Sequence, residues 1–206
     1  DRRLLRKALE VIKHQGVFDV SMLRSVPDIT VYSPSSYEGL KHAMQQALYS
    51  ESKLVAVRYP RGAQRAIPES IKPTFADFDV FGDENAEKAI ITYGRTFSAC
   101  AFAYEKLVNS GESVKLIKLN RIIPVCEGAV EAAKNCKDVY FFEEGIRRGG
   151  AGEGFLFDLS KAGFSGKYHL RAIENGFVKQ ASVESLLHKY GFDEEGVLSF
   201  VTSAEA

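Results

Sequence analysis

The fold is decided by the stretch Leu54-Val55-Ala56-Val57-Arg58-Tyr59-Pro60-Arg61-Gly62. Four apolar residues run into a turn with proline and glycine, which predicts a short buried strand whose end carries two guanidinium groups. Ligands of open α/β sheets bind at the carboxyl ends of strands, where an arginine can hold a phosphate or carboxylate through paired hydrogen bonds. The alternative is that Arg58 and Arg61 are solvated or paired with acids, as charged turn residues usually are.

The residues before this strand complete a strand, helix and strand in succession. Residues 29–32 are predicted as a strand, residues 33–36 as a turn with an N-cap, and residues 37–50 as an amphipathic helix. A βαβ unit of this kind normally forms a parallel sheet. The other elements expected in this half are helices over residues 1–13 and 17–24.

The second half repeats the alternation of strand and helix. Residues 63–83 lose periodicity and contain two prolines, so they are predicted as a linker, with one domain over residues 1–80 and another over 81–206. The expected class is α/β, with three-layer sheets of mostly parallel strands. The predicted strands are 88–94, 114–119, 138–144 and 168–173, and the predicted helices are 97–109 (capped by Thr96 or Ser98), 127–135, 155–162, 182–190 and 193–202.

The composition excludes several classes of partner. The chain has 206 residues, of which 45% are hydrophobic, and its 27 basic and 27 acidic side chains give a formal net charge of +0. Neither nucleic acid nor a membrane is therefore expected as a partner, and no apolar run reaches the roughly 20 residues of a membrane span. Three cysteines without a CxxC pair suggest a reducing compartment and small buried side chains. Cytoplasmic localisation is the expectation.

The glycine-rich run that follows Glu143 and Glu144 invites comparison with phosphate-binding loops. Its spacing fits neither G-x-x-x-x-G-K-[ST] nor G-x-G-x-x-G. The following helix could still offer its N-terminus to an anion. The preferred interpretation is close packing of helix on strand, with Glu143 and Glu144 available for an interface.

Histidine is the side chain that exchanges protons near neutral pH, so His14 is a candidate for catalysis, although an isolated histidine is more often a surface residue. His42, His169 and His188 are interpreted as structural, because no pair has the spacing of metal ligands. No Ser-His-Asp or Cys-His arrangement can be assembled from local motifs.

Several strings of residues carry a family resemblance when they are taken together and in order. They are HQGVFDVSMLR at 14–24, SPS at 33–35, VRYPRG at 57–62, AEK at 86–88, EE and GGAGEG within 143–154, and GFDEEG at 191–196. The combination resembles the 1-deoxy-D-xylulose-5-phosphate synthases, which are thiamine-diphosphate enzymes of the transketolase superfamily. The resemblance covers about residues 14–200. It implies part of a pyrimidine-binding domain followed by a complete transketolase C-terminal domain.

The resemblance also implies a reaction and two site residues. The family condenses pyruvate with glyceraldehyde 3-phosphate, releases carbon dioxide, and serves isoprenoid and thiamine biosynthesis. His14 matches the histidine that contacts substrate and the thiamine-bound intermediate, and Arg61 matches the arginine that holds the substrate phosphate. Arg58 is expected to be structural. The cofactors implied are thiamine diphosphate and Mg²⁺, and a homodimer is expected.

This chain departs from the family in ways that affect function. The family's activating glutamate and its Gly-Asp-Gly…Asn motif for magnesium and diphosphate have no counterpart here, so the chain alone is not expected to be active, and its cofactor-binding residues stay unassigned. Residues before about 13 are expected to come from a discontinuous segment. The alternatives are a transketolase, a relative of the 2-oxoacid dehydrogenase β-subunit, or a non-catalytic dimerisation or regulatory module.

Overall fold

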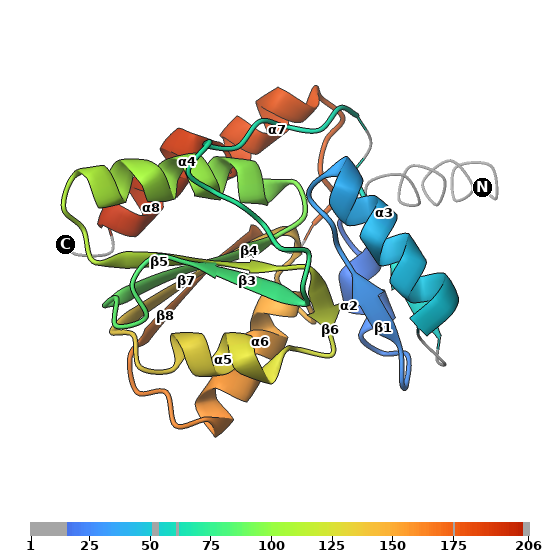
Figure 1. Ribbon diagram of the computed structural model, residues 1–206. Coiled ribbons are helices and arrows are strands. Elements are labelled where there is room, and N and C mark those ends of the chain that lie inside the picture. The colour runs from blue at the N-terminus through green and yellow to red at the C-terminus, as the bar shows by residue number, and fades with distance from the viewer. Residues whose placement is uncertain (1–15, 51–53, 61, 175, 204–206) are drawn as a thin grey trace.

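Two sheets organise the computed structural model, which describes residues 16–50, 54–60, 62–174 and 176–203 (Figure 1). The predicted helix over 1–13 and the two site residues His14 and Arg61 lie outside the described residues.

The first half contains the predicted βαβ unit. Strand β1 (Thr30–Tyr32) and strand β2 (Val55–Val57) run parallel, with Thr30 opposite Val55. Helix α3 (Tyr37–Gln45) connects them and continues into the π-helical turn η1 (Gln46–Ser50). The predicted N-cap is confirmed, because Ser36 Oγ accepts a hydrogen bond of 3.0 Å from the backbone N–H of Gly39. A short helix, α2 (Asp19–Leu23), precedes β1.

The second half is a three-layer α/β structure, which confirms the predicted fold class. Its sheet has the order β3-β5-β4-β7-β8, in which the last four run parallel and β3 is antiparallel to β5. Helices α4, α7 and α8 cover one face and α5 and α6 cover the other (Figure 1). The elements are β3 (Phe78–Phe81), β4 (Lys88–Tyr93), α4 (Thr96–Asn109), β5 (Val114–Leu119), β6 (Arg121–Ile123), α5 (Glu127–Ala133), β7 (Asp138–Ile146), α6 (Ala151–Lys161), β8 (Lys167–Ile173), α7 (Val183–Tyr190) and α8 (Glu194–Ser203).

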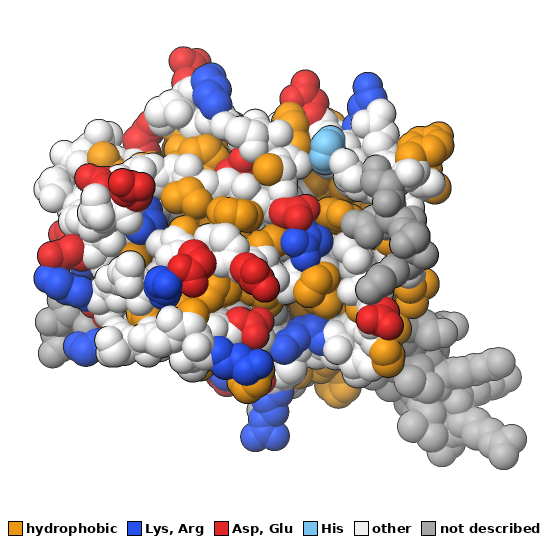
Figure 2. Space-filling model, turned by 60° about the horizontal axis from the view of Figure 1, so that its bottom comes forward, with side chains coloured by type: hydrophobic (Ala, Val, Ile, Leu, Met, Phe, Trp, Pro, Cys, Tyr) orange, Lys and Arg blue, Asp and Glu red, His pale blue; other side chains and the backbone are white. Residues whose placement is uncertain are grey.

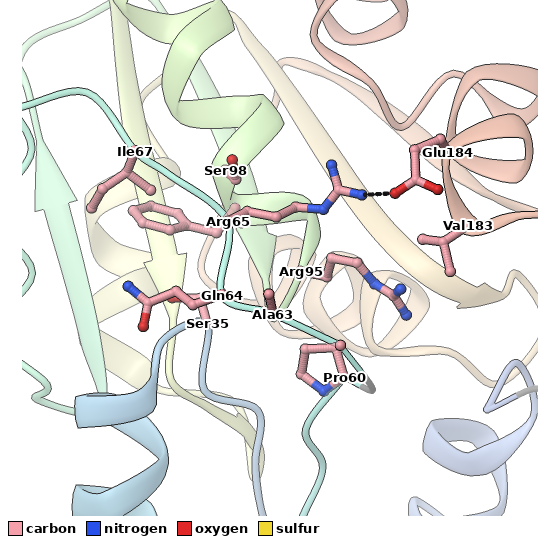
Figure 3. A pocket seen from close by; sticks show the side chains of 12 residues that line it. Ser35, Pro60, Ala63, Gln64, Arg65, Ile67, Arg95, Ser98, Val183 and Glu184 are labelled. Carbon is pink, nitrogen blue, oxygen red and sulfur yellow. Dashed lines mark hydrogen bonds and ion pairs between the residues drawn. The ribbon is translucent and has the colours of Figure 1, made fainter.

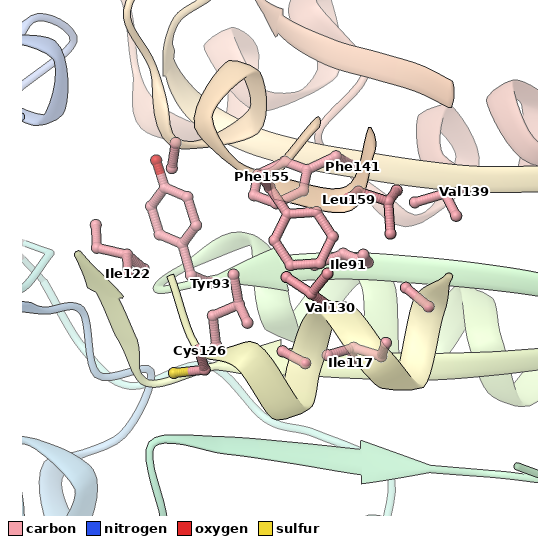
Figure 4. Packing of buried hydrophobic residues seen from close by; sticks show 14 of the residues in the cluster. Ile91, Tyr93, Ile117, Ile122, Cys126, Val130, Val139, Phe141, Phe155 and Leu159 are labelled. Carbon is pink, nitrogen blue, oxygen red and sulfur yellow. The ribbon is translucent and has the colours of Figure 1, made fainter. Parts of the chain in front are cut away.

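Each face of this sheet buries its own hydrophobic cluster. Figure 4 shows the cluster under α5 and α6, where Ile91 and Ile117 of the sheet meet Val130 of α5 and Phe155 of α6. The cluster on the other face includes Phe97 of α4 and Val197 of α8. Because the parallel strands are covered on both faces, they read as nearly continuous apolar runs in the sequence.

Two strands were not predicted. Strand β3 lies within the segment predicted as a linker, and the predicted domain boundary after residue 80 falls inside it. Strand β6 pairs antiparallel with β1, with Ile123 opposite Val31, so a strand from the second half completes the first sheet in the order β2-β1-β6. Strands of three or four residues are too short to show a hydrophobic period in the sequence. Their pairing also depends on partners that are distant in sequence.

Three local predictions were wrong. Strand β2 is half-buried rather than buried, because it is the edge strand of its sheet, and Leu54 before it is 59% exposed. Helix α6 begins at Ala151, within the glycine-rich run, rather than at residue 155. Neither Ser98 nor Thr96 caps α4, because Thr96 Oγ1 instead donates 2.8 Å back to the carbonyl of Tyr93.

The surface agrees with the balanced charge of the sequence. Acidic and basic side chains are interspersed on the face that Figure 2 shows. Among the described residues, no helix combines the length and the apolar character needed to cross a membrane.

Candidate functional site

Arg58 joins the two halves of the protein directly after β2. Its Nε donates a hydrogen bond of 2.8 Å to Asp19 Oδ2. Its Nη2 donates hydrogen bonds of 3.1 Å to the carbonyl oxygens of both Gly16 and Glu144. The guanidinium carbon also lies 5.8 Å from the centre of the Tyr93 ring. Nε and Nη2 are thus committed to protein acceptors, in agreement with the interpretation of Arg58 as structural.

A cavity of about 330 Å³, here called the strand-end cavity, lies next to this network (Figure 3). It is bounded by the chain that follows β2, by the beginning of α4 and by the beginning of α7. This is the edge of the molecule where β2 and β4 end, and the sequence predicts a ligand site at the end of β2. Its lining residues are Ser35, Pro60, Gly62, Ala63, Gln64, Arg65, Ile67, Arg95, Phe97, Ser98, Val183 and Glu184.

The segment after Gly62 is held against three helices. Gln64 Oε1 accepts a hydrogen bond of 2.8 Å from the first backbone N–H of α3. Ser98 Oγ of α4 donates a hydrogen bond of 2.5 Å to the carbonyl of Ala66. Arg65 Nη2 lies 3.3 Å from Glu184 Oε1 of α7, across the cavity (Figure 3). The segment after Gly62, which lines the strand-end cavity, is therefore held by contacts with both halves of the chain.

Two arginines that the sequence did not single out line this cavity. Arg95 forms a two-pronged ion pair with Glu144, with distances of 3.0 Å from Nε to Oε2 and 2.9 Å from Nη2 to Oε1. Arg65 is more loosely held, because its side chain is 39% exposed and that of its partner is 77% exposed. Arg95 directly follows the glycine that ends β4, so the argument applied to β2 could have found it. Each arginine is thus paired with a carboxylate, and one of these acids, Glu184, also lines the cavity.

The two site residues expected from the sequence, His14 and Arg61, cannot be placed because they lie outside the described residues. The chain neighbours of Arg61, Pro60 and Gly62, both line the strand-end cavity.

The remaining histidines occupy structural positions. His169 Nε2 lies 2.8 Å from Asp138 Oδ1, in the neighbouring strand, and its ring stacks on that of Tyr140. His188 Nδ1 lies 2.6 Å from Asp193 Oδ2, and this hydrogen bond raises the pKa of the imidazole. Among the described residues, no group of three or more His, Cys, Asp or Glu side chains could hold a metal ion.

Glu143 occupies the N-terminus of α6, where the sequence suggested that an anion could bind. Its carboxylate accepts hydrogen bonds from the backbone N–H groups of Ala151 (2.9 Å) and Gly152 (3.1 Å) and from the hydroxyl of Tyr93 (3.1 Å). Complete burial raises the pKa of Glu143 to about 7. The prediction that Glu143 is available for an interface is wrong, because Glu143 is fully buried at the start of α6, whereas the partly exposed Glu144 pairs with Arg95. The glycines do permit close packing, as predicted.

The cysteines are small buried side chains, as the sequence indicated. Cys100, Cys126 and Cys136 are all free and buried. Burial raises the pKa of the Cys100 thiol to about 12 and that of Cys126 to about 11, so neither is a thiolate at neutral pH.

Curated relatives of this chain are synthases that are much longer than it is. The chain is 27% identical over 193 residues to 1-deoxy-D-xylulose-5-phosphate synthase of Shouchella clausii, covering 92% of this chain and 31% of that protein. The same enzyme of Bacteroides fragilis is 29% identical over 195 residues (92% and 30%), and that of Geobacillus thermodenitrificans is 30% identical over 187 residues (86% and 29%). The chain thus spans less than a third of the length of these relatives.

Solved structures show the same fold. A split-gene transketolase, described as an inactive β4 tetramer, matches with a TM-score of 0.75 and 20% identity, over 93% of this chain and 62% of that one. Transketolase from Campylobacter jejuni matches with a TM-score of 0.70 and 16% identity, over 92% of this chain and 28% of that one.

Two family models divide the chain between them. The transketolase pyrimidine-binding domain matches residues 10–66, and the transketolase C-terminal domain matches residues 82–197. The second match alone covers more than half of the chain, and it contains the whole five-stranded sheet except β3. The order of the matches is the order expected from the sequence strings, and the chain belongs to the transketolase family.

Proposed function

We propose that this chain is part of a thiamine-diphosphate-dependent 1-deoxy-D-xylulose-5-phosphate synthase. The enzyme would condense pyruvate with glyceraldehyde 3-phosphate, release carbon dioxide and supply isoprenoid and thiamine biosynthesis. The similarity to three synthases over about nine-tenths of the chain carries this proposal. A cytoplasmic homodimer is proposed with it.

Arg61 is proposed to bind the substrate phosphate, and His14 to contact the substrate and exchange a proton with it. Pro60 and Gly62, the chain neighbours of Arg61, line the strand-end cavity, which supports substrate binding by Arg61 at this edge of the molecule. An arginine is suited to a phosphate because its donors match two phosphate oxygens at once. A histidine can exchange a proton at neutral pH.

Bound thiamine diphosphate supplies the carbanion chemistry that this reaction requires. We assign none of the described residues to its diphosphate or to Mg²⁺, because those residues contain no metal-ligand group and the helix terminus at α6 is taken by Glu143. The chain alone is therefore proposed to be inactive, with cofactor binding supplied by the remainder of the enzyme.

A second candidate is that the chain acts as one subunit of a split enzyme. The fold match to a split-gene transketolase favours it. In that arrangement the cofactor-binding part would be a separate polypeptide.

The test is product analysis of the complete enzyme that contains this chain. With [1-¹³C]pyruvate and glyceraldehyde 3-phosphate, we expect labelled carbon dioxide and 1-deoxy-D-xylulose 5-phosphate, both dependent on added thiamine diphosphate. Transfer of a ketol group from a ketose phosphate, without carbon dioxide release from pyruvate, would instead identify a transketolase. Restoration of activity by adding a second polypeptide to the 206-residue chain would identify a split enzyme.

A further inference from the structure

A second cavity, here called the β8 pocket, lies where β7 and β8 end. Its volume is about 460 Å³, and it shares no lining residue with the strand-end cavity. The carboxyl ends of parallel strands are the usual place for ligands in α/β sheets. The described residues that line it include Arg147, Arg171, Glu174, Phe177, Lys189 and Phe200.

Arg171 is held in this pocket by an aromatic ring, and no polar partner for it is found among the described residues. Its guanidinium carbon lies 4.2 Å from the centre of the Phe200 ring. A Cβ on Gly191 would lie 3.5 Å from the same carbon, so the backbone of the α7 C-terminus packs against the guanidinium as well. The Nε atom is buried and has no hydrogen-bond partner among the described residues. Burying a charged donor in this way costs free energy unless something pairs with it.

The charges of the β8 pocket do not balance. Among the described lining residues there are three cations and one acid, Glu174, which is already paired with Arg147 at 2.8 Å. Arg147 also donates 2.7 Å to the carbonyl of Leu170. Within the described part of the chain, neither Arg171 nor Lys189 has an ion pair. Burial and the nearby positive charge of Arg147 both lower the pKa of Arg171.

This arrangement differs from the structural arginines of the same molecule. Arg58 and Arg95 each direct their donors at a carboxylate. Arg171 is instead packed against an aromatic ring and a backbone, and it lines a cavity. Two uncompensated cations match the charge of about −2 that a phosphate group carries near neutral pH. We propose that the β8 pocket binds a small molecule bearing a phosphate group, with Arg171 and Lys189 as its charged donors.

Inorganic phosphate is the probe for the test, with two-dimensional ¹H–¹⁵N NMR of the whole chain at pH 7 and constant ionic strength. We expect saturable shifts of the Gly176, Phe177 and Gly191 amides. Arg171→Gln and Lys189→Gln should each weaken this binding by about tenfold or more, as the loss of a charge-assisted hydrogen bond does. Spectra of the free variants establish that each is folded.

Matched control variants distinguish phosphate binding at the β8 pocket from general electrostatic attraction of phosphate to the protein. Arg148→Gln and Lys167→Gln remove the same charges from exposed positions that do not line the pocket, and they should leave the affinity unchanged. Arg61→Gln should also leave these shifts unchanged, because that residue belongs to the proposed substrate site. An equal loss in all variants, or shifts that do not saturate, would overturn the proposal without affecting the proposed function.

Discussion

Arg58 Nε and Asp19 Oδ2 lie 2.8 Å apart, although the two residues are separated by 39 positions in the chain. The same guanidinium reaches the carbonyl of Glu144, at the end of the second sheet. One side chain therefore connects the loop after β2, helix α2 and strand β7. Its role is to hold the first half of the chain against the second, next to the strand-end cavity.

Replacing Arg58 with alanine should destabilise the protein by about 3 kcal/mol. The variant would leave the Gly16 and Glu144 carbonyls without their donor and Asp19 without its counter-ion. The Arg58 side chain is only 15% exposed, so water cannot replace these contacts fully. Urea denaturation followed by circular dichroism measures the loss.

Arg65→Ala is the matched control for this experiment. It removes the same charge from the same segment, but both members of its ion pair are well exposed. Exposed pairs contribute about 0–1 kcal/mol. Equal destabilisation by the two substitutions would contradict the role given to Arg58.

Gly150→Ala should destabilise the protein by about 1–3 kcal/mol, the usual cost of overpacking. A Cβ at this position would lie 2.5 Å from Glu143 Oε1 and 2.6 Å from the carbonyl of Ile146, and neither can move without disturbing the start of α6. Gly176→Ala is the control, because its Cβ would meet nothing within 4 Å. Thermal unfolding of both variants tests this, and a similar change in melting temperature for the two would refute the steric argument.

Glu143 should make stability depend on pH. Its pKa is about 7 in the folded protein and 4.5 as the reference value, so the folded state binds the proton more tightly. Its stabilising contribution is therefore complete below pH 4.5 and is lost as the pH rises to about 7. The loss amounts to roughly 3 kcal/mol.

Glu143→Gln tests this dependence because it cannot ionise. The free energy of unfolding of the wild type, relative to the variant, should fall between pH 5 and pH 8. A difference between the two proteins that stays constant over this range would show that Glu143 does not titrate as stated. Denaturation curves at four pH values are sufficient.

Individual elements and residues show which features of the structure could be predicted from the sequence. Strand β5 has the predicted bounds, because an apolar run buried on both faces is visible in sequence. Strand β6 was missed because its pairing with β1 is a tertiary contact that three residues do not encode. The role of Glu143 could not be predicted because its partners are the amides that begin α6. These amides come within reach of Glu143 only when the glycine-rich run folds back against β7. The role of Arg95 could not be predicted because its partner, Glu144, lies 49 positions away and comes within reach only in the folded sheet.

Arg61→Ala in the complete enzyme should raise the KM for the phosphorylated substrate by about 10- to 100-fold, which corresponds to the loss of a charge-assisted contact. The kcat and the KM for pyruvate should change little, because the contact is made equally in the ground state. Lys72→Ala is the control, since it removes an exposed cation that does not line the strand-end cavity. An unchanged KM for the phosphorylated substrate would exclude Arg61 from phosphate binding.

His14→Ala in the complete enzyme should lower kcat by about 10²–10⁴-fold, the range typical of groups that transfer protons. Binding of the phosphorylated substrate should be affected less, because Arg61 is proposed to supply most of it. The control is His42→Ala, which removes a histidine of α3 whose Nε2 lies 3.4 Å from Gln46 Nε2 and whose ring centre lies 6.4 Å from that of Phe75. The pH profile of kcat provides a second measurement, since loss of the proton-exchanging group should remove one of its ionisations. If His14→Ala keeps both the rate and the profile of the wild type, His14 has no part in proton transfer, and the proposal for this residue fails while the one for Arg61 stands.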